Sequence, residues 1–467
     1  MSNLRLQGIK AISLVLVMVM ALSLFGVQVS AFAQDNAEWD AEYENEYGEA
    51  AQALAWQELL EISPLNVPSR PPVLITNNQQ MREFLNGSLG RNDDHFILTA
   101  DVDVVGGSAG FTTQGRGFSI NCHTSVFTGT FYGGRHTISN LRLRRSTTSD
   151  RTGDQLNNTS IGFVRTAGNG ARIENVRFAN TPAPTGNPAG TGNNTATGAN
   201  NVFNASGGVG GANLRVGMVV GRVVSGAVVI DNVHLGRVSV GINMNASTTR
   251  IGGMVGHVEP RSGVSIRNFS INELEVLTNQ GMSSGDGGLT HSVGGVIGSS
   301  SGTVYITATN PIDSANISPG NLSGRNSVAV MSRGSSIYNR FNNAHRVGGV
   351  IGYAAAGSHT TIHHTNVTGS PRVSAGHADF YLRSAVFAGG IVGTTGSGGL
   401  LAIRHVNSDV GVSGARANSR IGGIVGHTGA ATVLENVTNN GMVRMVGQTA
   451  TAGAVSLMMP PTLQAYA

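Results

Sequence analysis

Ile251-Gly252-Gly253-Met254-Val255-Gly256 is one copy of a phrase that recurs along the chain: an apolar residue, two glycines, two apolar residues and a closing glycine. Further copies stand at residues 293–298, 347–352, 388–393 and 421–426. A looser copy at 216–221 and a degenerate one that begins at Ile161 precede them. The closing glycines follow one another at intervals of 35, 42, 54, 41 and 33 residues. Repetition at such a period is typical of a solenoid or a propeller.

A second phrase, Ile-x-Asn-apolar, accompanies the first. It stands at residues 138–141, 173–176, 230–233 and 266–269, with a near copy at 434–437, a variant at 403–406 and a weaker match at His364. Where both phrases occur, the Asn or His follows the closing glycine by 10 to 12 residues. Each unit is therefore a nearly constant strand-turn-strand pair followed by a loop of variable length. We expect loops that leave the scaffold at 179–213, 279–291, 307–346 and 370–384.

The strand pattern decides between the repeat architectures. The repeats consist of short apolar or alternating strands, and no helical periodicity is seen after residue 90. A propeller needs about four strands per unit, whereas these units offer two or three. The sequence therefore predicts an all-β solenoid of stacked coils. In such a stack the Asn of the second phrase would form a ladder of side-chain amides and would tolerate the bend between two strands.

The N-terminal third predicts several distinct segments. Residues 1–33 have the features of a secretory signal, with Arg5 and Lys10 in front of an apolar run and Ala31-Phe32-Ala33 as the cleavage site. Residues 34–72 form an acidic segment and a proline-rich linker. Residues 73–145 are expected to form an N-terminal cap and the first coil, with strands at 73–76 and 95–104 and a short helix through 79–85 capped by Asn77 or Asn78. The solenoid repeats then occupy 146–457, and 458–467 form a tail.

Charge is distributed unevenly along the chain. Nine acidic residues and no basic one lie between Gln34 and Glu61, so the part from residue 62 onward carries a net charge of +11. Lys10 is the only lysine, so without the signal the positive charge resides on arginine alone. A basic body of this kind suits acidic polymers, although a solvated arginine-rich surface is the simpler interpretation. The single cysteine, Cys122, excludes a disulfide framework.

The two phrases together carry a family resemblance. The Gly-Gly-apolar-apolar-Gly phrase followed by Ile-x-Asn-apolar resembles the GLUG-motif repeat of bacterial secreted and surface proteins, and residues 96–103, 127–131 and 136–141 look like the start of such an array. The resemblance covers roughly residues 73 to 457. It implies a right-handed parallel β-helix of the kind found in adhesin-like proteins and in the non-catalytic part of immunoglobulin A peptidases.

The sequence contains few residues in patterns typical of catalysis. The chain has no H-E-x-x-H run, and a phosphate-binding loop would need a lysine that the body lacks. The densest carboxylate group, Asp93, Asp94, Asp101 and Asp103, lies at the expected cap, where aspartates in turns are ordinary. A polysaccharide lyase on the same fold is the enzyme alternative, since such enzymes combine carboxylates with a basic residue on one face. The sequence assigns no catalytic, cofactor-binding or metal-ligating residue.

Alignment of the second phrase predicts an outward-facing row. The middle residues would stack at about 4.8 Å steps and form weak salt bridges between neighbours. The row consists of Ser139, Glu174, Asp231, Arg267, His363, Arg404 and Glu435. At the other end, residues 452–457 look like a degraded copy without its partner phrase, so the last coil would present an open edge.

These observations predict a secreted or cell-surface, non-enzymatic β-solenoid that binds glycans or extracellular protein surfaces. The alternatives are a carbohydrate-active enzyme on the same scaffold and a fragment of a longer surface protein or peptidase. No specific nucleic acid and no membrane contact beyond the signal are expected. End-to-end self-association through the C-terminal coil is a further expectation.

Overall fold

The computed structural model divides the chain into two units, Met1–Trp56 and Gln57–Ala467. The structure describes residues 70–85, 87–104, 118–119, 126–139, 141, 143–144, 158–179, 201–206, 213–243, 248–278, 290–308, 326–333, 345–367, 372–375, 386–409, 411–414, 420–441 and 443–445, all in the second unit. The predicted signal (1–33), most of the acidic segment and linker (34–72), Cys122, the degraded copy at 452–457 and the tail (458–467) lie outside these residues.

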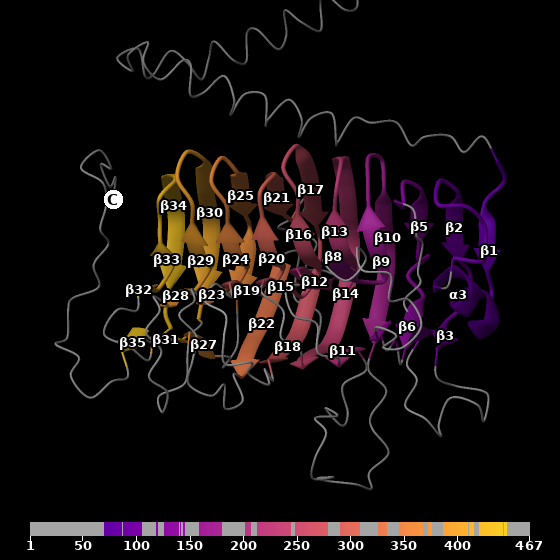
Figure 1. The fold of residues 1–467 in the computed structure, drawn as a ribbon, viewed down its shortest axis with the longest axis horizontal. Coiled ribbons are helices and arrows are strands. Elements are labelled where there is room, and N and C mark those ends of the chain that lie inside the picture. The colour runs from indigo at the N-terminus through magenta and orange to yellow at the C-terminus, as the bar shows by residue number, and fades with distance from the viewer. Residues whose placement is uncertain are drawn as a thin grey trace, which may run out of the picture. The chain divides into compact units, whose positions relative to one another are not determined.

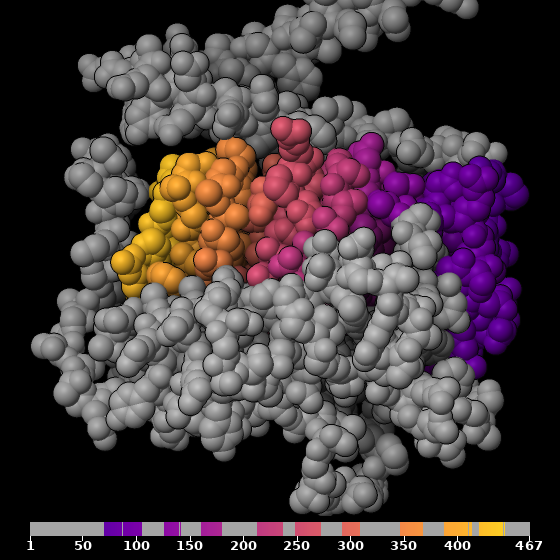
Figure 2. Space-filling view, in the orientation of Figure 1, coloured from indigo at the N-terminus to yellow at the C-terminus, as the bar shows by residue number. Residues whose placement is uncertain are grey.

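The described residues form a parallel β-solenoid, as the repeats predict. Each coil runs through three sheets in turn, and every strand pairs in parallel with the equivalent strand of the next coil, as between β12 (Asn213–Gly217) and β15 (Thr248–Gly252). The coils follow one another in chain order from indigo to yellow (Figure 1), and their side chains form successive bands (Figure 2). Parallel pairing satisfies the backbone of each coil through its two neighbours.

Sheets 1 and 2 each receive one strand per coil. Sheet 1 consists of β8 (Asn158–Ile161), β12, β15, β19 (Thr290–Gly294), β23 (His345–Gly348), β28 (Val386–Gly389) and β32 (Arg420–Gly422). Sheet 2 consists of β9 (Val164–Ala167), β13 (Val220–Val223), β16 (Val255–Val258), β20 (Ile297–Ser300), β24 (Ile351–Ala354), β29 (Val392–Thr395) and β33 (Val425–His427). The glycine phrase links the two sheets within each coil, so its glycines mark where the chain turns from sheet 1 into sheet 2.

Sheet 3 closes each coil and is interrupted by the bend of the second phrase. Its repeat strands are β10 (Arg172–Ala179), β11 (Asn201–Ser206), β14 (Gly226–Asn243), β17 (Ser262–Arg267), β18 (Ser270–Thr278), β21 (Thr303–Thr307), β22 (Asn326–Arg333), β25 (His359–His363), β26 (Thr365–Val367), β30 (Leu400–Ser408) and β34 (Ala431–Asn439). A fourth sheet contains β27 (Arg372–Ala375), β31 (Gly411–Gly414) and β35 (Val443–Met445).

The N-terminal cap consists of one helix and of shorter strands that join sheet 3. These are β1 (Val73–Ile75), α3 (Asn78–Leu85), β2 (His95–Leu98), β3 (Val102–Asp103), β4 (Phe118–Ser119), β5 (Thr130–Tyr132), β6 (Thr137–Ser139) and β7 (Leu143–Arg144). The Asn77 side chain accepts a 3.0 Å hydrogen bond from the Gln80 amide, so Asn77 is the helix N-cap, one of the two residues predicted. The strand predicted over 95–104 is split, because the chain turns between β2 and β3.

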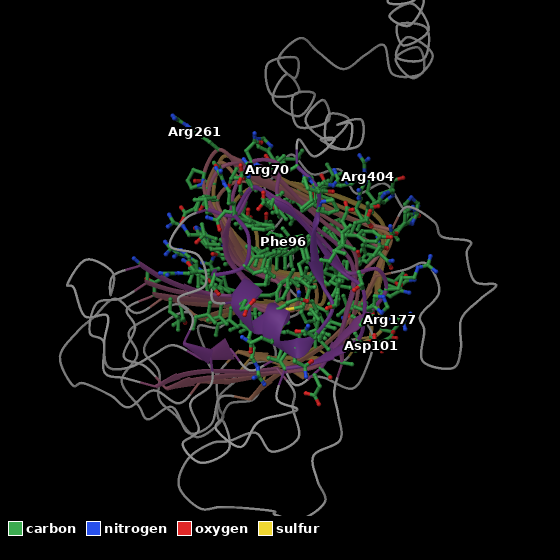
Figure 3. All side chains as sticks on the ribbon, turned by 90° about the vertical axis from the view of Figure 1, so that its right-hand side faces the viewer. Arg70, Phe96, Asp101, Arg177, Arg261 and Arg404 are labelled. Atoms are coloured by element: carbon green, nitrogen blue, oxygen red, sulfur yellow. The ribbon has the colours of Figure 1, made fainter. Side chains whose placement is uncertain are left out.

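The helix closes the first end of the core with aromatic side chains. Phe84 of α3 is fully buried and lies 4.9 Å from Phe96 and 5.2 Å from Phe131, measured between ring centroids. Phe163 and Phe178 extend this cluster into the first repeat coil. Seen along the stack, Phe96 lies in the interior (Figure 3). The rings cover apolar surface that an uncapped solenoid would expose to water.

The C-terminal end of the described solenoid exposes strand edges and apolar side chains. The last described strands, β32, β33, β34 and β35, each pair on one side only within the described residues. Val433 and Leu434 are each 39% exposed, although the equivalent Ile403 of the preceding coil is fully buried. The described part of the solenoid therefore ends in an edge with unpaired backbone groups. Self-association through this coil stays a prediction.

Two expectations about the repeats are wrong in detail. The segments expected to be loops contain strands, because β11, β22 and β27 add parallel partners to neighbouring coils. The copy of the second phrase at 138–141 is out of register: Thr130–Tyr132 lies opposite Arg172–Glu174, whereas Ile138 lies opposite Phe178. The pattern Ile-x-Asn thus marks two different places on the coil, which spacing alone does not separate.

Candidate functional site

The second phrase forms the bend inside sheet 3, as predicted. Its Asn or His adopts a left-handed backbone, with φ between 47° and 54° at Asn175, Asn232, Asn268, His364, His405 and Asn436. Asn and His are among the non-glycine residues that adopt this conformation most readily. The need for φ above zero at this position in six coils explains why both Asn and His occur there.

The side-chain ladder predicted along these bends is present in part. Asn232 donates to the Asn175 side chain at 2.5 Å, and the Asn436 amide lies 3.4 Å from His405 Nδ1. The rings of His364 and His405 stack with centroids 5.1 Å apart. Asn268 departs from the ladder, because its amide donates to Asp231 at 2.9 Å. The ladder therefore stabilises the scaffold, as predicted.

The outward row on sheet 3 is also confirmed, with two corrections. Thr307, which is only 4% exposed, lies opposite Arg267 and therefore stands between Arg267 and His363. Glu174, Asp231 and Arg267 lie in register, as do His363, Arg404 and Glu435. Arg267 pairs with Asp231 at 3.0 Å and Arg404 with Glu435 at 3.3 Å, and Arg404 points outward in Figure 3. Ser139 does not belong to the row: Tyr132 lies opposite Glu174, and Ser139 lies opposite Ala179.

The cap aspartates do not converge on one site. Asp94 accepts from Arg70 at 2.9 Å and from the Arg91 amide at 2.8 Å, so it closes a turn. Asp101 accepts from the Thr137 amide at 2.8 Å and thereby joins two coils. The part of the chain that the structure describes contains no group of three or more His, Cys, Asp or Glu residues placed to hold a metal ion.

Two histidines on sheet 3 are held in their neutral form. Burial, and then the charge of Arg177, lowers the pKa of His234 to about 4. Its ring nitrogens lie 2.9 Å from Ser270 Oγ and 2.8 Å from Asn232 Oδ1. Burial, followed by the neighbouring His364 and His405, lowers the pKa of His363 to about 4.

We therefore expect the solenoid to lose stability in mild acid. Between pH 6.5 and about 4 the unfolded chain binds protons at these two positions that the folded chain does not, so the free energy of unfolding falls as the pH decreases. Urea unfolding at pH 7.5, 6 and 5 measures this slope. The double variant His234→Gln, His363→Asn should show a flatter slope above pH 5; an unchanged slope would assign the acid sensitivity to other groups.

The glycine phrase forms a corner between the outer faces of sheets 1 and 2. A Cβ placed on Gly252 would lie 2.0 Å from Val255 O and 2.6 Å from Val296 O, and one on Gly298 would lie 2.4 Å from Ile251 N. The same contacts recur at the equivalent glycines of the other coils. Backbone approaches backbone so closely that no side chain fits. We call this feature the glycine corner.

Two rows of side chains flank the glycine corner, one on each sheet. The sheet 1 row contains, in register, Ser160, Arg215, Arg250, Ser292, Arg346, Phe387 and Arg420. The sheet 2 row contains Thr166, Arg222, His257, Ser299, Tyr353, Thr394 and His427. Four arginines therefore follow one line along sheet 1, and Arg222 lies in the sheet 2 row. The sheet 2 strands continue into the turns to sheet 3, where Arg261 projects (Figure 3).

Glu259 is the only carboxylate with a described contact to these rows. Its Oε1 lies 2.7 Å from Arg222 Nε and 3.2 Å from an Arg215 guanidinium nitrogen, and its Oε2 lies 3.6 Å from His257 Nε2. His257 is 3% exposed, and its Nδ1 lies 2.7 Å from Ser299 Oγ. One negative charge is thus shared by two arginines of different sheets.

Burial is the main cause of the pKa shifts of the basic groups in the corner. Burial, and then Arg222 and Arg250, lowers the pKa of Arg215 to about 10. Burial is also the main cause that lowers the pKa values of Arg250, Arg346 and His257. For Glu259, burial alone would raise the pKa, but His257, Arg222 and Arg215 outweigh it and lower the pKa to about 2. Near neutral pH the corner is cationic.

Aromatic side chains accompany the arginines in the later coils. The Arg346 guanidinium carbon lies 3.7 Å from the centre of the Tyr353 ring, across the corner from sheet 1 to sheet 2. Arg420 lies 6.0 Å from the Phe387 ring, which in turn lies 5.4 Å from His427. A cation is attracted to the face of an aromatic ring, and the contact with Tyr353 restricts the orientation of the Arg346 guanidinium.

The sequence contains a signal for this site just outside the glycine phrase. In the sheet 1 row the residue immediately precedes the apolar start of the glycine phrase, and in the sheet 2 row it immediately follows the closing glycine. Arg215, Arg250, Arg346 and Arg420 all occupy the first position. The outward row that the sequence predicts is a different one. It consists of the middle residues of the second phrase, which lie on sheet 3.

The comparisons with known proteins do not assign the chain to a family. No family model matches it, so the GLUG resemblance stays a prediction. Halomucin from Haloquadratum walsbyi (strain DSM 16790 / HBSQ001) is 30% identical over 143 residues, which is 30% of this chain and 1% of that protein. A crystal structure from Bacteroides ovatus, provisionally assigned as an immunoglobulin A1 protease, covers 82% of this chain and 79% of its own at 16% identity and a TM-score of 0.36. The fold therefore rests on the strand pairing.

The single described helix, α3, is only eight residues long. Among the described residues, accordingly, no helix has the length and apolar character needed to cross a bilayer.

Proposed function

We propose that the chain is a secreted or cell-surface, non-enzymatic binding module whose glycine corner holds a glycan chain. The observation that carries this proposal is the pair of side-chain rows along the corner, which places arginines in four of the coils and the aromatic rings of Phe387 and Tyr353 in two of the later ones. A polymer with repeating units suits a surface with repeating contacts. Arginine and aromatic side chains bind acidic groups and sugar faces, respectively.

A binding role fits the chemistry of the corner better than catalysis does. The pKa of Glu259 is lowered to about 2, so this carboxyl has no proton to donate near neutral pH. His257 is enclosed and contacts Ser299 and Glu259. Hydrolysis of a glycosidic bond would need a second carboxylate facing the first, and the described corner residues contain only Glu259. The similarity to Halomucin supports an extracellular location.

The proposal is tested with the secreted chain on an array of neutral, carboxylated and sulfated glycans, alongside a panel of extracellular matrix proteins. We expect glycan binding that weakens with salt, since part of the attraction is electrostatic. Arg420→Gln, an exposed change in the corner, should reduce binding. Arg404→Gln, an equally exposed arginine on the sheet 3 row, should leave it unchanged.

Two results would overturn the proposal. Unsaturated products from uronate polymers would show that the chain is a lyase, the alternative on the same scaffold. Binding to matrix proteins alone, or equal losses from Arg420→Gln and Arg404→Gln, would remove the corner from the explanation.

A further inference from the structure

The coil that contains β19 and β20 has small residues in both corner rows. Ser292 stands on sheet 1 in register between Arg250 of one neighbouring coil and Arg346 of the other. On sheet 2, Ser299 stands between His257 and Tyr353 in the same way. Both serines are nearly inaccessible, with 2% and 1% of their surface exposed. Long side chains from the two flanking coils therefore border a step made of short ones.

Within the described residues, no carboxylate forms an ion pair with either of the two arginines that flank this step. Glu259 is already bonded to Arg215 and Arg222. Among the described residues, Arg250 NH1 is buried and makes no hydrogen bond. Leaving a buried charged donor without an acceptor is costly, and buried polar groups in folded proteins are almost always paired. Burial lowers the pKa of Arg250, the charge of Glu259 partly opposes this shift, and the charges of Arg346 and Arg222 add to it.

The second arginine is held in a defined orientation. Arg346 stacks on the Tyr353 ring at 3.7 Å, which occupies one face of the guanidinium and leaves its edge with the N–H donors for another partner. Tyr353 comes from sheet 2 of the same coil, so the glycine corner brings the two together. A guanidinium fixed in plane is prepared for a two-point contact with an oxyanion.

We infer that the Ser292 step is an oxyanion-binding site in which Arg250 and Arg346 together hold one sulfate ester, carboxylate or phosphate group. The three groups share the chemistry that matters, namely two oxygens that accept from the edge of a guanidinium. The inference rests on the proposed function for its biological ligand, an acidic glycan. The oxyanion site itself follows from the residues of the corner.

The experiment uses the full secreted chain and the variants Arg250→Gln, Arg346→Gln and Arg404→Gln. Thermal unfolding is followed in sodium sulfate, in sodium phosphate and in sodium chloride of equal ionic strength. Sulfate stabilises many proteins nonspecifically, so the readout is the difference between variants rather than the increase itself. An anion that binds the folded chain raises the midpoint as its concentration rises. We expect this specific increase in the native chain and in Arg404→Gln, and its loss in the two corner variants.

The stability without added anion separates a binding role from a structural one. Arg250→Gln removes a buried charge with an unpaired donor, so its midpoint in dilute chloride should equal or exceed that of the native chain. A structural role predicts the opposite: a lower midpoint in dilute chloride with the anion response retained. A lower midpoint in dilute chloride with the anion response retained would overturn the inference. The same sulfate response in all variants would overturn it as well.

Calorimetry then identifies the source of the oxyanion. A sulfated polysaccharide, a uronate polymer, a neutral polysaccharide and phospholipid vesicles are titrated into each protein. Arg250→Gln should weaken the best acidic polysaccharide about tenfold or more, since it removes a charge-assisted hydrogen bond. Acidic-polysaccharide binding of unchanged strength in Arg250→Gln would overturn this site and leave the proposed function intact. Sulfate binding without binding to any glycan would support the site and refute the proposed function.

Discussion

Gly349→Asp will disrupt the central coils and lower the free energy of unfolding by more than about 4 kcal/mol. A Cβ at this position would lie 2.0 Å from Gly390 O of the next coil and 3.1 Å from Val367 Cγ1. The clash involves backbone, so it cannot be relieved by a change of rotamer. The aspartate would add a charge in a place that has neither water nor a partner.

Urea unfolding followed by circular dichroism measures this effect. Gly263→Ala is the matched control, because Gly263 is buried in β17 but a Cβ there would meet only Thr303 at 3.6 Å, an ordinary contact. The control should stay within about 1 kcal/mol of the native chain. A stable Gly349→Asp protein would mean that the coils do not approach each other at the glycine phrase as closely as described.

Glu259→Gln will have the second largest effect, a loss of about 3 kcal/mol in the free energy of unfolding near neutral pH. The Glu259 side chain is 19% exposed and contacts Arg215, Arg222 and His257. Glutamine keeps the size of the side chain but removes the negative charge that offsets the arginines of two sheets. Removing one partner of a buried ion pair is costly because the other charge stays buried.

The matched control for this change is Glu435→Gln. Glu435 also pairs with an arginine, at 3.3 Å from Arg404, but both side chains are about half exposed. Water screens this pair, so its loss should cost less than about 1 kcal/mol. Equal effects of the two substitutions in urea unfolding at low salt would show that the corner is solvated and that its charges need no partner.

The pH dependence gives Glu259→Gln a second readout. The pKa of Glu259 is lowered to about 2 in the folded chain from an ordinary value of 4.5, so its contribution to stability is present above pH 4.5 and disappears as the pH falls towards 2. The Gln variant lacks this loss. Its unfolding free energy should therefore decrease less than that of the native chain between pH 4.5 and 2.

Much of the scaffold follows from local rules that the sequence displays directly. Gly349 and its equivalents recur because each coil needs a place where backbone meets backbone, and that requirement is the same in every repeat. Asn232 and His405 recur because each bend needs a left-handed residue. The helix at Asn78–Leu85 was predictable from its N-cap, since capping depends only on neighbours in the sequence.

The register of the strands could not be predicted from the sequence as well as these features of the scaffold. Ile138 and Ile173 begin the same four-residue phrase, yet Ile138 pairs with Phe178. The strands inside the variable segments were also missed, because β22 is a strand only by virtue of the neighbours β18 and β26 that pair with it. Strand propensity depends strongly on such context, and short polar strands have little signal of their own.

The sequence by itself determined the coil, its glycine corner, its left-handed bends and its apolar interior, because these depend on contacts that every repeat makes in the same way. Only the tertiary structure decided which outward side chains meet. Arg346 and Tyr353 stack because sheets 1 and 2 fold towards each other at the glycines, and Arg250 and Arg346 flank the short side chain of Ser292 because the three residues are in register. Segments of unequal length separate Arg250 from Ser292 and Ser292 from Arg346 in sequence, so the placement of these three residues in one row depends on the register of the stack.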